Sequence, residues 1–333
     1  MDHSRPTMKD VATAAGVSLK TVSRVVNGEP GVAPRTEQQV REAIEALGFR
    51  RNDSARLLRT GQAATVGLVL EDIGDPFYSG LSRGVESVAR AHGSLLLSGS
   101  SDADPDTEHQ LALALCARRV DGLIIVPTSA DHGYLVPEMM AGIPVVFADR
   151  PPGGIDADTV LSDNVGGARK GTAHLIAGGH RRIGYIGDDH SIFTARERHQ
   201  GYREAMSEAE LLIADSWVAM GTPTADSVSG ALKRMLAGPE PVTALFCGNN
   251  RVSVLALHIL AAREESLAMV GFDDFELADL LGLTVVAQDP GELGYQACEL
   301  LFQRMSGDRE PSRRIVIPTR MQRRGSGERR PLR

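Results

Sequence analysis

This sequence of 333 residues contains no apolar run long enough to cross a membrane. Its longest apolar runs, such as residues 95–97 and 123–126, span a few residues, whereas a membrane helix needs roughly 18. The opening segment MDHSRPTMKDVA is polar and lacks the charged and apolar regions of a secretory signal. We therefore expect a cytoplasmic protein.

Cysteine is scarce, which argues against a disulfide framework. The three cysteines, Cys116, Cys247 and Cys298, are odd in number, far apart in the chain and surrounded by apolar residues. Such a pattern is typical of free, buried thiols and does not match a metal-binding knuckle.

Signatures of common enzyme classes are also lacking. The segment GGARKGT at residues 166–172 does not have the Gly-Lys-Ser/Thr order of a phosphate loop, and no G-x-G-x-x-G follows the first expected strand. No Ser-His-Asp set stands out. The DDH segment at residues 188–190 is expected to be a solvated loop, because adjacent residues cannot easily converge on one metal ion. We predict no enzyme activity, no cofactor and no metal.

Charge divides the chain into two parts. Residues 1–60 carry 10 Lys and Arg against 7 Asp and Glu, whereas the remaining residues carry 26 against 36. With 42% hydrophobic and 24% charged residues, the composition is that of a globular protein. A small basic module before a large acidic one favours a polyanionic partner for the front of the chain only.

Residues 1–50 predict three short helices. The first, MKDVATAA, ends at Gly16; Ser18 can cap the second, with Thr21 in its first turn; and TEQQVREAIEALG forms a third with Thr36 as its expected cap. A helix that follows a glycine turn and has polar side chains in its first turn is typical of a helix-turn-helix. A solvated helical hairpin is the alternative.

The second helix lies in the segment GVSLKTVSRVVNG, residues 16–28. In a helix-turn-helix it enters a DNA major groove, with Leu19, Lys20 and Arg24 toward base edges. Thr21, Ser23 and Asn27 then point toward phosphates. The following residues, 51–62, are basic and form at most a marginal helix capped by Asn52, which needs a docking partner to fold.

Residues 63–333 alternate short β-branched runs with amphipathic helical patterns, which predicts parallel sheets covered on both faces and divided into two lobes. Polar residues follow many of the expected strands, and ligands bind at the carboxyl ends of parallel strands. The alternative is that these acids cap the next helices. The residues concerned are Asp72, Asp149, Asp188, Asn249, Asp273 and Gln288, with Arg150 and Arg198 nearby.

Several long segments carry a family resemblance. MKDVATAAGVSLKTVSRVVNG, LGFRRNDSARLLRTGQAATVGLVLEDIGDPFY, RRVDGLIIVP, GHRRIGYIGD and MVGFDDFELADLL follow one another in the order found in the LacI-type (lactose/galactose repressor) family of bacterial transcriptional regulators, which the chain resembles. The resemblance implies an all-α helix-turn-helix DNA-binding head and an α/β periplasmic-binding-protein-like core of two parallel-sheet lobes. The implied lobes are about 63–161 with 290–318, and about 162–289 with 319–333.

The resemblance also implies a function and site residues. A homodimer binds a two-fold symmetric operator as a regulator, mostly a repressor, and responds to a small-molecule effector such as a sugar. Its hinge helix contains Asn52 and Ala55 and inserts Leu58 into the minor groove. The effector positions match Phe77, Asp149, Arg150, Arg198, Asn249, Asp273 and Gln288.

The chain departs from the family pattern at four places. Arg51 stands where Pro is usual, Asn250 stands where an Asp commonly follows the strand-tip Asn, and Pro223 stands where many relatives have an aromatic ring. The connection LAAREESLAMVGFDD is also short. A non-sugar effector therefore stays open. A sugar-transport binding protein would share the core but would not carry residues 1–60. The segment RRGSGERRPLR shows no leucine heptad, which favours a dimer over a tetramer.

Overall fold

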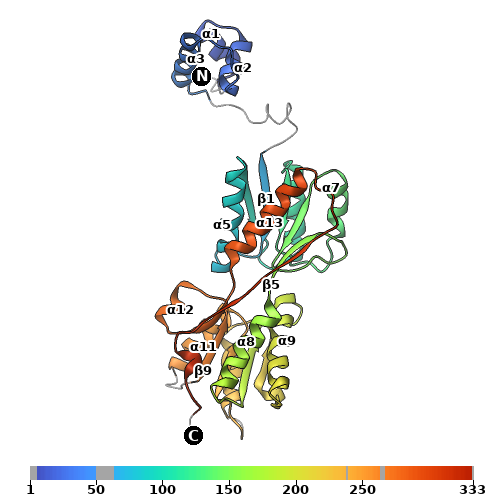
Figure 1. The fold of residues 1–333 in the computed structure, drawn as a ribbon, viewed down its shortest axis with the longest axis vertical. Coiled ribbons are helices and arrows are strands. Elements are labelled where there is room, and N and C mark those ends of the chain that lie inside the picture. The colour runs from blue at the N-terminus through green and yellow to red at the C-terminus, as the bar shows by residue number, and fades with distance from the viewer. Residues whose placement is uncertain (1–5, 50–63, 238, 263–266, 332–333) are drawn as a thin grey trace. The chain divides into compact units, whose positions relative to one another are not determined.

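The computed structural model describes residues 6–49, 64–237, 239–262 and 267–331. The chain divides into two compact units, Met1–Ala63 and Ala64–Arg333. Figure 1 labels several of their helices and strands. Among the described residues, no helix has the length and apolar character needed to span a bilayer.

The first unit contains three helices, α1 (Met8–Ala15), α2 (Leu19–Asn27) and α3 (Pro34–Leu47). Their core is small and consists mainly of Val11, Val22 and Val40, all fully buried. Each helix ends at a glycine with positive φ, a conformation that glycine adopts without steric cost. As predicted, α1 ends before Gly16.

The start of the third helix differs from the sequence prediction. Thr36 does not cap it: α3 begins at Pro34, with Ala33 at the N-cap position. Proline is favoured in the first helical turn because its φ is already helical and its missing N–H has no intrahelical acceptor there. Thr36 therefore lies inside the first turn, where its backbone N–H donates to the Ala33 carbonyl.

The second unit contains two six-stranded sheets. The first sheet has the order β11-β5-β4-β3-β1-β2, and its strands are all parallel. Helices α5 and α13 cover one face, and α6, η1 and α7 cover the other. The bounds are β1 (Thr65–Leu70), α5 (Pro76–Ala91), β2 (Leu95–Ser100), α6 (Pro105–Ala117), β3 (Gly122–Ile125), η1 (Gly133–Leu135), α7 (Val136–Met140), β4 (Val145–Ala148), β5 (Asp158–Ser162), α13 (Pro290–Met305) and β11 (Arg314–Ile317).

The second sheet has the order β12-β10-β9-β8-β6-β7, with β12 antiparallel to β10 and the other pairs parallel. Helices α8 and α9 pack on one face, and α10, α11 and α12 on the other. The bounds are α8 (Asn164–Ala177), β6 (Ile183–Gly187), α9 (Phe193–Glu208), η2 (Asp215–Trp217), β7 (Val218–Met220), α10 (Ala225–Ala237), β8 (Ala244–Cys247), α11 (Asn250–Ala262), β9 (Ala268–Phe272), α12 (Glu276–Leu280), β10 (Thr284–Ala287), β12 (Arg320–Gln322) and η3 (Ser326–Glu328).

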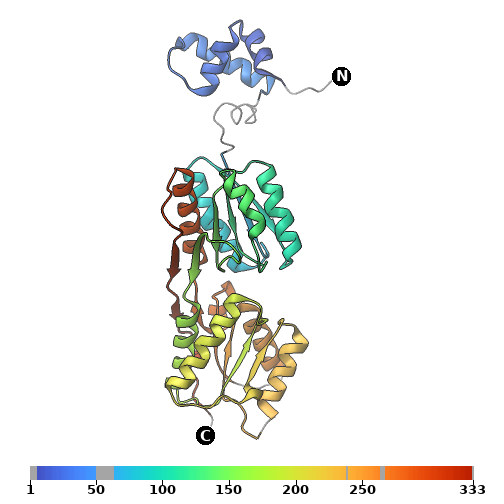
Figure 2. The same cartoon turned by 90° about the vertical axis from the view of Figure 1, so that its right-hand side faces the viewer.

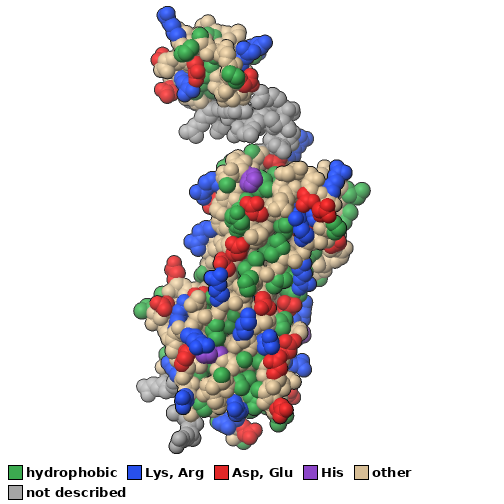
Figure 3. Space-filling model, in the orientation of Figure 1, with side chains coloured by type: hydrophobic (Ala, Val, Ile, Leu, Met, Phe, Trp, Pro, Cys, Tyr) green, Lys and Arg blue, Asp and Glu red, His purple; other side chains and the backbone are tan. Residues whose placement is uncertain are grey.

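The chain passes between the two sheets three times, after β5, after β10 and after β11. The β5–α8 and β11–β12 segments run side by side between the lobes (Figure 2). Each lobe is therefore built from segments far apart in the sequence. On the face of the core that Figure 3 shows, acidic and basic side chains lie intermixed. The three cysteines are free and buried, as predicted.

Candidate DNA-reading helix and ligand pocket

Helix α2 has one buried and one exposed side. The Ser18 hydroxyl accepts a hydrogen bond from the Thr21 backbone N–H at 3.1 Å, which fixes the first turn as the sequence predicts. Val22 is fully buried, and Val25 and Val26 pack against the same core. The apolar side of the helix thus fixes its rotation in the three-helix unit.

The exposed side of α2 carries the predicted base-reading residues. Leu19 is 46% exposed, and Lys20 is exposed. Arg24 is half-buried on the last turn. Asn27 donates to the Ser23 hydroxyl at 3.2 Å, so two of the three residues predicted to meet phosphates are held together. The exposed side of α2 therefore presents both polar and apolar side chains.

Three predicted DNA-binding residues cannot be placed. Asn52, Ala55 and Leu58 lie outside the residues that the structure describes. Their assignment to a hinge helix stays a prediction from the sequence.

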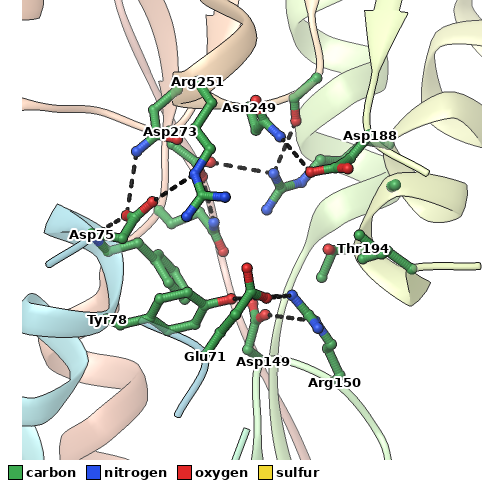
Figure 4. Close-up of a pocket in the computed structure, with 17 residues that line it drawn as sticks. Glu71, Asp75, Tyr78, Asp149, Arg150, Asp188, Thr194, Asn249, Arg251 and Asp273 are labelled. Carbon is green, nitrogen blue, oxygen red and sulfur yellow. Dashed lines mark hydrogen bonds and ion pairs between the residues drawn. The ribbon is translucent and has the colours of Figure 1, made fainter. Parts of the chain in front are cut away.

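A pocket lies between the two lobes of the second unit, at the carboxyl ends of the strands (Figure 4). It encloses about 530 Å³ of empty space, including its open mouth. The strand tips meet there because the parallel strands of both sheets point their carboxyl ends toward the cleft. All seven predicted effector positions line it, namely Phe77, Asp149, Arg150, Arg198, Asn249, Asp273 and Gln288.

In the first lobe, three side chains bind one another at the pocket wall. The Arg150 guanidinium donates to Glu71 Oε2 at 2.7 Å and to the Tyr78 hydroxyl at 3.0 Å, while Tyr78 donates to Glu71 at 3.0 Å. Figure 4 shows these side chains converging. A third hydrogen bond from Arg150 reaches the Pro127 carbonyl at 3.0 Å. Burial raises the pKa of Tyr78 well above its ordinary value, so it remains a neutral donor.

Asp149 is a buried carboxyl at the tip of β4. It is 3% exposed, and its Oδ2 lies 3.5 Å from Arg150 Nε. Its Oδ1 is buried and has no hydrogen-bond partner among the described residues. Burial raises the pKa of Asp149 to about 6, although the positive charges of Arg150 and Arg198 oppose the shift.

The two lobes repeat one backbone feature. Asp149 after β4 has φ 67°, and Asp273 after β9 has φ 73°, both in the left-handed region. Each donates its backbone N–H to the neighbouring strand, at Val160 and Val286 respectively. This turn conformation costs energy for a residue other than glycine, and it aims both carboxyls at the pocket.

In the second lobe, Arg198 on α9 is held on several sides. Its Nε donates to Asn164 Oδ1 at 2.9 Å, and its Nη1 donates to the Gly248 carbonyl at 2.9 Å and lies 3.3 Å from Asp273 Oδ2. The guanidinium lies over the Phe272 ring, 4.0 Å from its centroid. Arg198 is 6% exposed, so the pocket holds a rigid, preorganised fork of donors.

Contacts across the cleft join the two lobes. Asn250 Nδ2, at the start of α11, donates to Asp75 Oδ1 at 3.3 Å. Arg251 lies 3.6 Å from both Asp75 and Asp72 (Figure 4 shows the pair with Asp75). The Asp expected at position 250 from the family pattern would face Asp75 with a like charge, whereas Asn250 donates to it.

Sequence reasoning missed several pocket residues. Asp72, the expected tip of β1, does not line the pocket, and its neighbour Glu71 does. No local sequence pattern marks Arg251 as a pocket residue, because its partners Asp72 and Asp75 come from the other lobe. Pro223 does not line the pocket either. The residues missed include Glu71, Asp75, Tyr78, Thr194, Asn250 and Arg251.

A helix-turn-helix unit joined to a two-lobed core with a polar pocket between its lobes defines a class, the ligand-responsive transcription regulators. Comparison with known protein families supports this class. Residues 7–52 match the model of bacterial regulatory proteins of the lacI family. Residues 63–324 match the model of periplasmic binding proteins and the sugar-binding domain of the LacI family.

Individual relatives extend over the full chain. The HTH-type transcriptional regulator CelR of Thermobifida fusca is 34% identical over 340 residues, covering 97% of this chain and 98% of that protein. A solved CelR–cellobiose complex matches with a TM-score of 0.70 and 32% identity, covering 97% of this chain and all of that one. A lac repressor dimer bound to operator has a TM-score of 0.85, 24% identity and 97% coverage of this chain and 99% of that one, which shows the shared fold.

The chain belongs to the LacI family of bacterial regulatory proteins. The family and the fold class predicted from the sequence are confirmed. The protein is a DNA-binding transcriptional regulator and not an enzyme, as the same family assignment shows.

Proposed function

We propose that the protein acts in the cytoplasm as a repressor that binds a two-fold symmetric operator as a homodimer. A small ligand in the interlobe pocket changes its affinity for that operator. The observation that carries the proposal is the convergence of seven family effector positions on one pocket. A sugar or a related metabolite is the proposed ligand. The CelR relative has been solved with cellobiose.

Exposed apolar side chains support the dimer. Leu95 and Leu97 on the edge strand β2 are 70% and 40% exposed. Leu277 and Leu280 on α12 are 58% and 83% exposed. Apolar side chains grouped in this way mark surfaces that a partner covers. A second copy of the chain is the partner that an operator with two-fold symmetry requires.

The pocket suits a coupling role because its walls come from both lobes. A ligand that contacts Asp149 in one lobe and Arg198 in the other binds the closed arrangement more tightly than the open one. Such differential binding shifts the population of lobe arrangements. When one arrangement places the two heads of the dimer in register with the operator, the ligand and the DNA become thermodynamically coupled.

The DNA-binding residues are proposed in two groups. Leu19, Lys20 and Arg24 meet base edges, whereas Thr21, Ser23 and Asn27 meet phosphates. The hinge residues Asn52, Ala55 and Leu58 are proposed to dock in the minor groove.

Replacing Arg24 with Ala tests the base-reading role. We expect the operator, selected from a random duplex pool, to be bound about 1–3 kcal/mol more weakly, because a lost base contact removes discrimination. Random duplex should be affected much less. Binding is measured by fluorescence anisotropy at fixed salt. Arg41→Ala on α3, an exposed arginine paired with Glu37, is the matched control. Equal losses on both duplexes would reduce Arg24 to a phosphate contact.

A further inference from the structure

The charges around the pocket are unequal. Five carboxyl groups and three guanidinium groups line it, and both lobes contribute to each kind. The carboxyls are Glu71, Asp75, Asp149, Asp188 and Asp273, and the guanidiniums are Arg150, Arg198 and Arg251. With all of these groups ionised, the pocket walls carry an excess of negative charge.

The three arginines already have carboxylate partners. Arg150 binds Glu71 at 2.7 Å, Arg198 lies 3.3 Å from Asp273, and Arg251 lies 3.6 Å from Asp75. An anionic ligand could reach one of these guanidiniums only beside, or in place of, its carboxylate partner. Each arginine is thus electrostatically compensated before a ligand arrives.

Two buried acceptor atoms in the pocket wall are unused. Asp149 Oδ1 and Gln288 Oε1 have no hydrogen-bond partner among the described residues. Asp149 is 3% exposed, so bulk water satisfies it poorly. A buried acceptor without a partner costs free energy, and a ligand that donates a hydrogen bond recovers that cost. Hydroxyl groups are suitable donors.

We propose that the pocket takes an uncharged, hydroxyl-rich ligand and rejects the phosphorylated and carboxylated forms of the same compound. This inference rests on the proposed function and specifies the ligand class of that site. Ligand hydroxyls donate to Asp149 and Gln288 and accept from Arg198, whereas a phosphate or carboxylate meets the surplus of carboxylates.

The ligand class places the regulator in a reaction sequence. The regulator then binds the uncharged form of a metabolite, before an enzyme adds a phosphate or a carboxylate to that metabolite. A reaction that phosphorylates the compound, or oxidises it to an acid, then removes the signal.

The test uses the full chain and matched compounds. Unfolding temperature and calorimetric Kd are measured with glucose, galactose, ribose and cellobiose, and with glucose 6-phosphate, galactose 6-phosphate, ribose 5-phosphate, glucuronate and galacturonate. We expect binding among the uncharged compounds only, with anionic counterparts at least tenfold weaker. A phosphate or uronate that binds as tightly as its uncharged parent would overturn the inference and leave the proposed function standing. Binding by no compound in the panel would count against both.

A charge variant separates electrostatic selection from shape. Asp188→Asn removes one negative charge from the wall and keeps the size of the side chain. We expect the ratio of anion Kd to parent Kd to fall at least threefold. The control is Asp226→Asn on α10, an exposed acid outside the pocket, which should leave the ratio unchanged. An unchanged ratio in Asp188→Asn would contradict the proposal.

Discussion

Asp149 shows how one residue combines burial, strain and charge. It occupies a left-handed conformation at a strand tip, and burial raises its pKa to about 6. A stable protein keeps such a costly residue only where the surrounding structure holds it in place. The free-energy cost of burying this carboxylate can be measured as a pH dependence of the unfolding free energy.

Stability should depend on the pH through Asp149. Because the pKa of Asp149 is raised in the folded state, the folded protein binds the Asp149 proton more tightly than the unfolded chain does. The resulting contribution to the free energy of unfolding is fully present below about pH 4 and is lost as the pH rises through about 6. Asp149→Asn removes it. Between pH 4 and 7 the unfolding free energy of the variant should gain about 2–3 kcal/mol relative to the wild type. Denaturant unfolding measured at several pH values checks this, and parallel pH curves for the two proteins would contradict it.

At this scale, the strand-end rule predicted much of the pocket. Asp149, Asp273 and Gln288 directly follow apolar strands, so sequence position alone places them at the edge where ligands bind. Glu71 and Arg251 could not be found in this way. Their positions depend on Arg150 from another strand and on Asp75 from the other lobe, which are tertiary pairings that no local pattern carries.

At the scale of the elements, helices α5 and α13 approach each other closely. A Cβ on Gly84 would lie 2.1 Å from the Gly291 carbonyl oxygen, and one on Gly294 would lie 2.1 Å from the Leu81 carbonyl oxygen. Each helix therefore uses a glycine to let the other backbone approach. This crossing covers one face of the first sheet and holds Phe77 and Tyr78 at the pocket.

Gly84→Ala should destabilise the protein by about 1–3 kcal/mol, because the added methyl group meets a backbone atom that cannot move aside cheaply. The matched control is Gly230→Ala on α10, where the added carbon meets nothing within 4 Å apart from its chain neighbours and its own helix backbone. Alanine favours a helix more than glycine does, so the control should gain up to about 1 kcal/mol. Denaturant midpoints measure both effects. Equal changes in the two variants would exclude a role for the close helix crossing.

The elements that sequence patterns missed depend on distant partners. The sequence marks eight apolar runs as strand candidates, and all eight form strands of the sheets, but β5, β7, β11 and β12 were not predicted. The eight runs are residues 65–72, 94–100, 121–127, 143–149, 181–188, 243–249, 267–273 and 283–289. Strand β5 begins with Asp158, a residue that from sequence alone favours a turn. In the structure Arg304 Nε donates to Asp158 Oδ2 at 2.7 Å, a distant partner that the local pattern does not show. Strands β7 and β12 are three residues long and lie at sheet edges. Such short strands carry too little periodicity to be recognised.

At the scale of the whole molecule, the ligand-binding unit is a pair of lobes joined by three chain crossings and by contacts at the pocket mouth. Asp75, Asn250 and Arg251 link the lobes across the cleft. A ligand between the lobes adds to these links. The alternation of strands and helices predicted the parallel sheets, and the length of the segment, large for one core, predicted two lobes. The cross-cleft links became visible only in the structure.

The most direct test of the account is the operator affinity of the full chain with and without a ligand that raises its unfolding temperature. Fluorescence anisotropy at fixed salt should show that the ligand changes the operator Kd at least tenfold and the random-duplex Kd much less. Arg198→Lys, which keeps the charge but loses the planar fork, should bind the operator normally and lose the ligand effect. An operator Kd that is the same with and without ligand, or equal affinity for every duplex, would contradict the account.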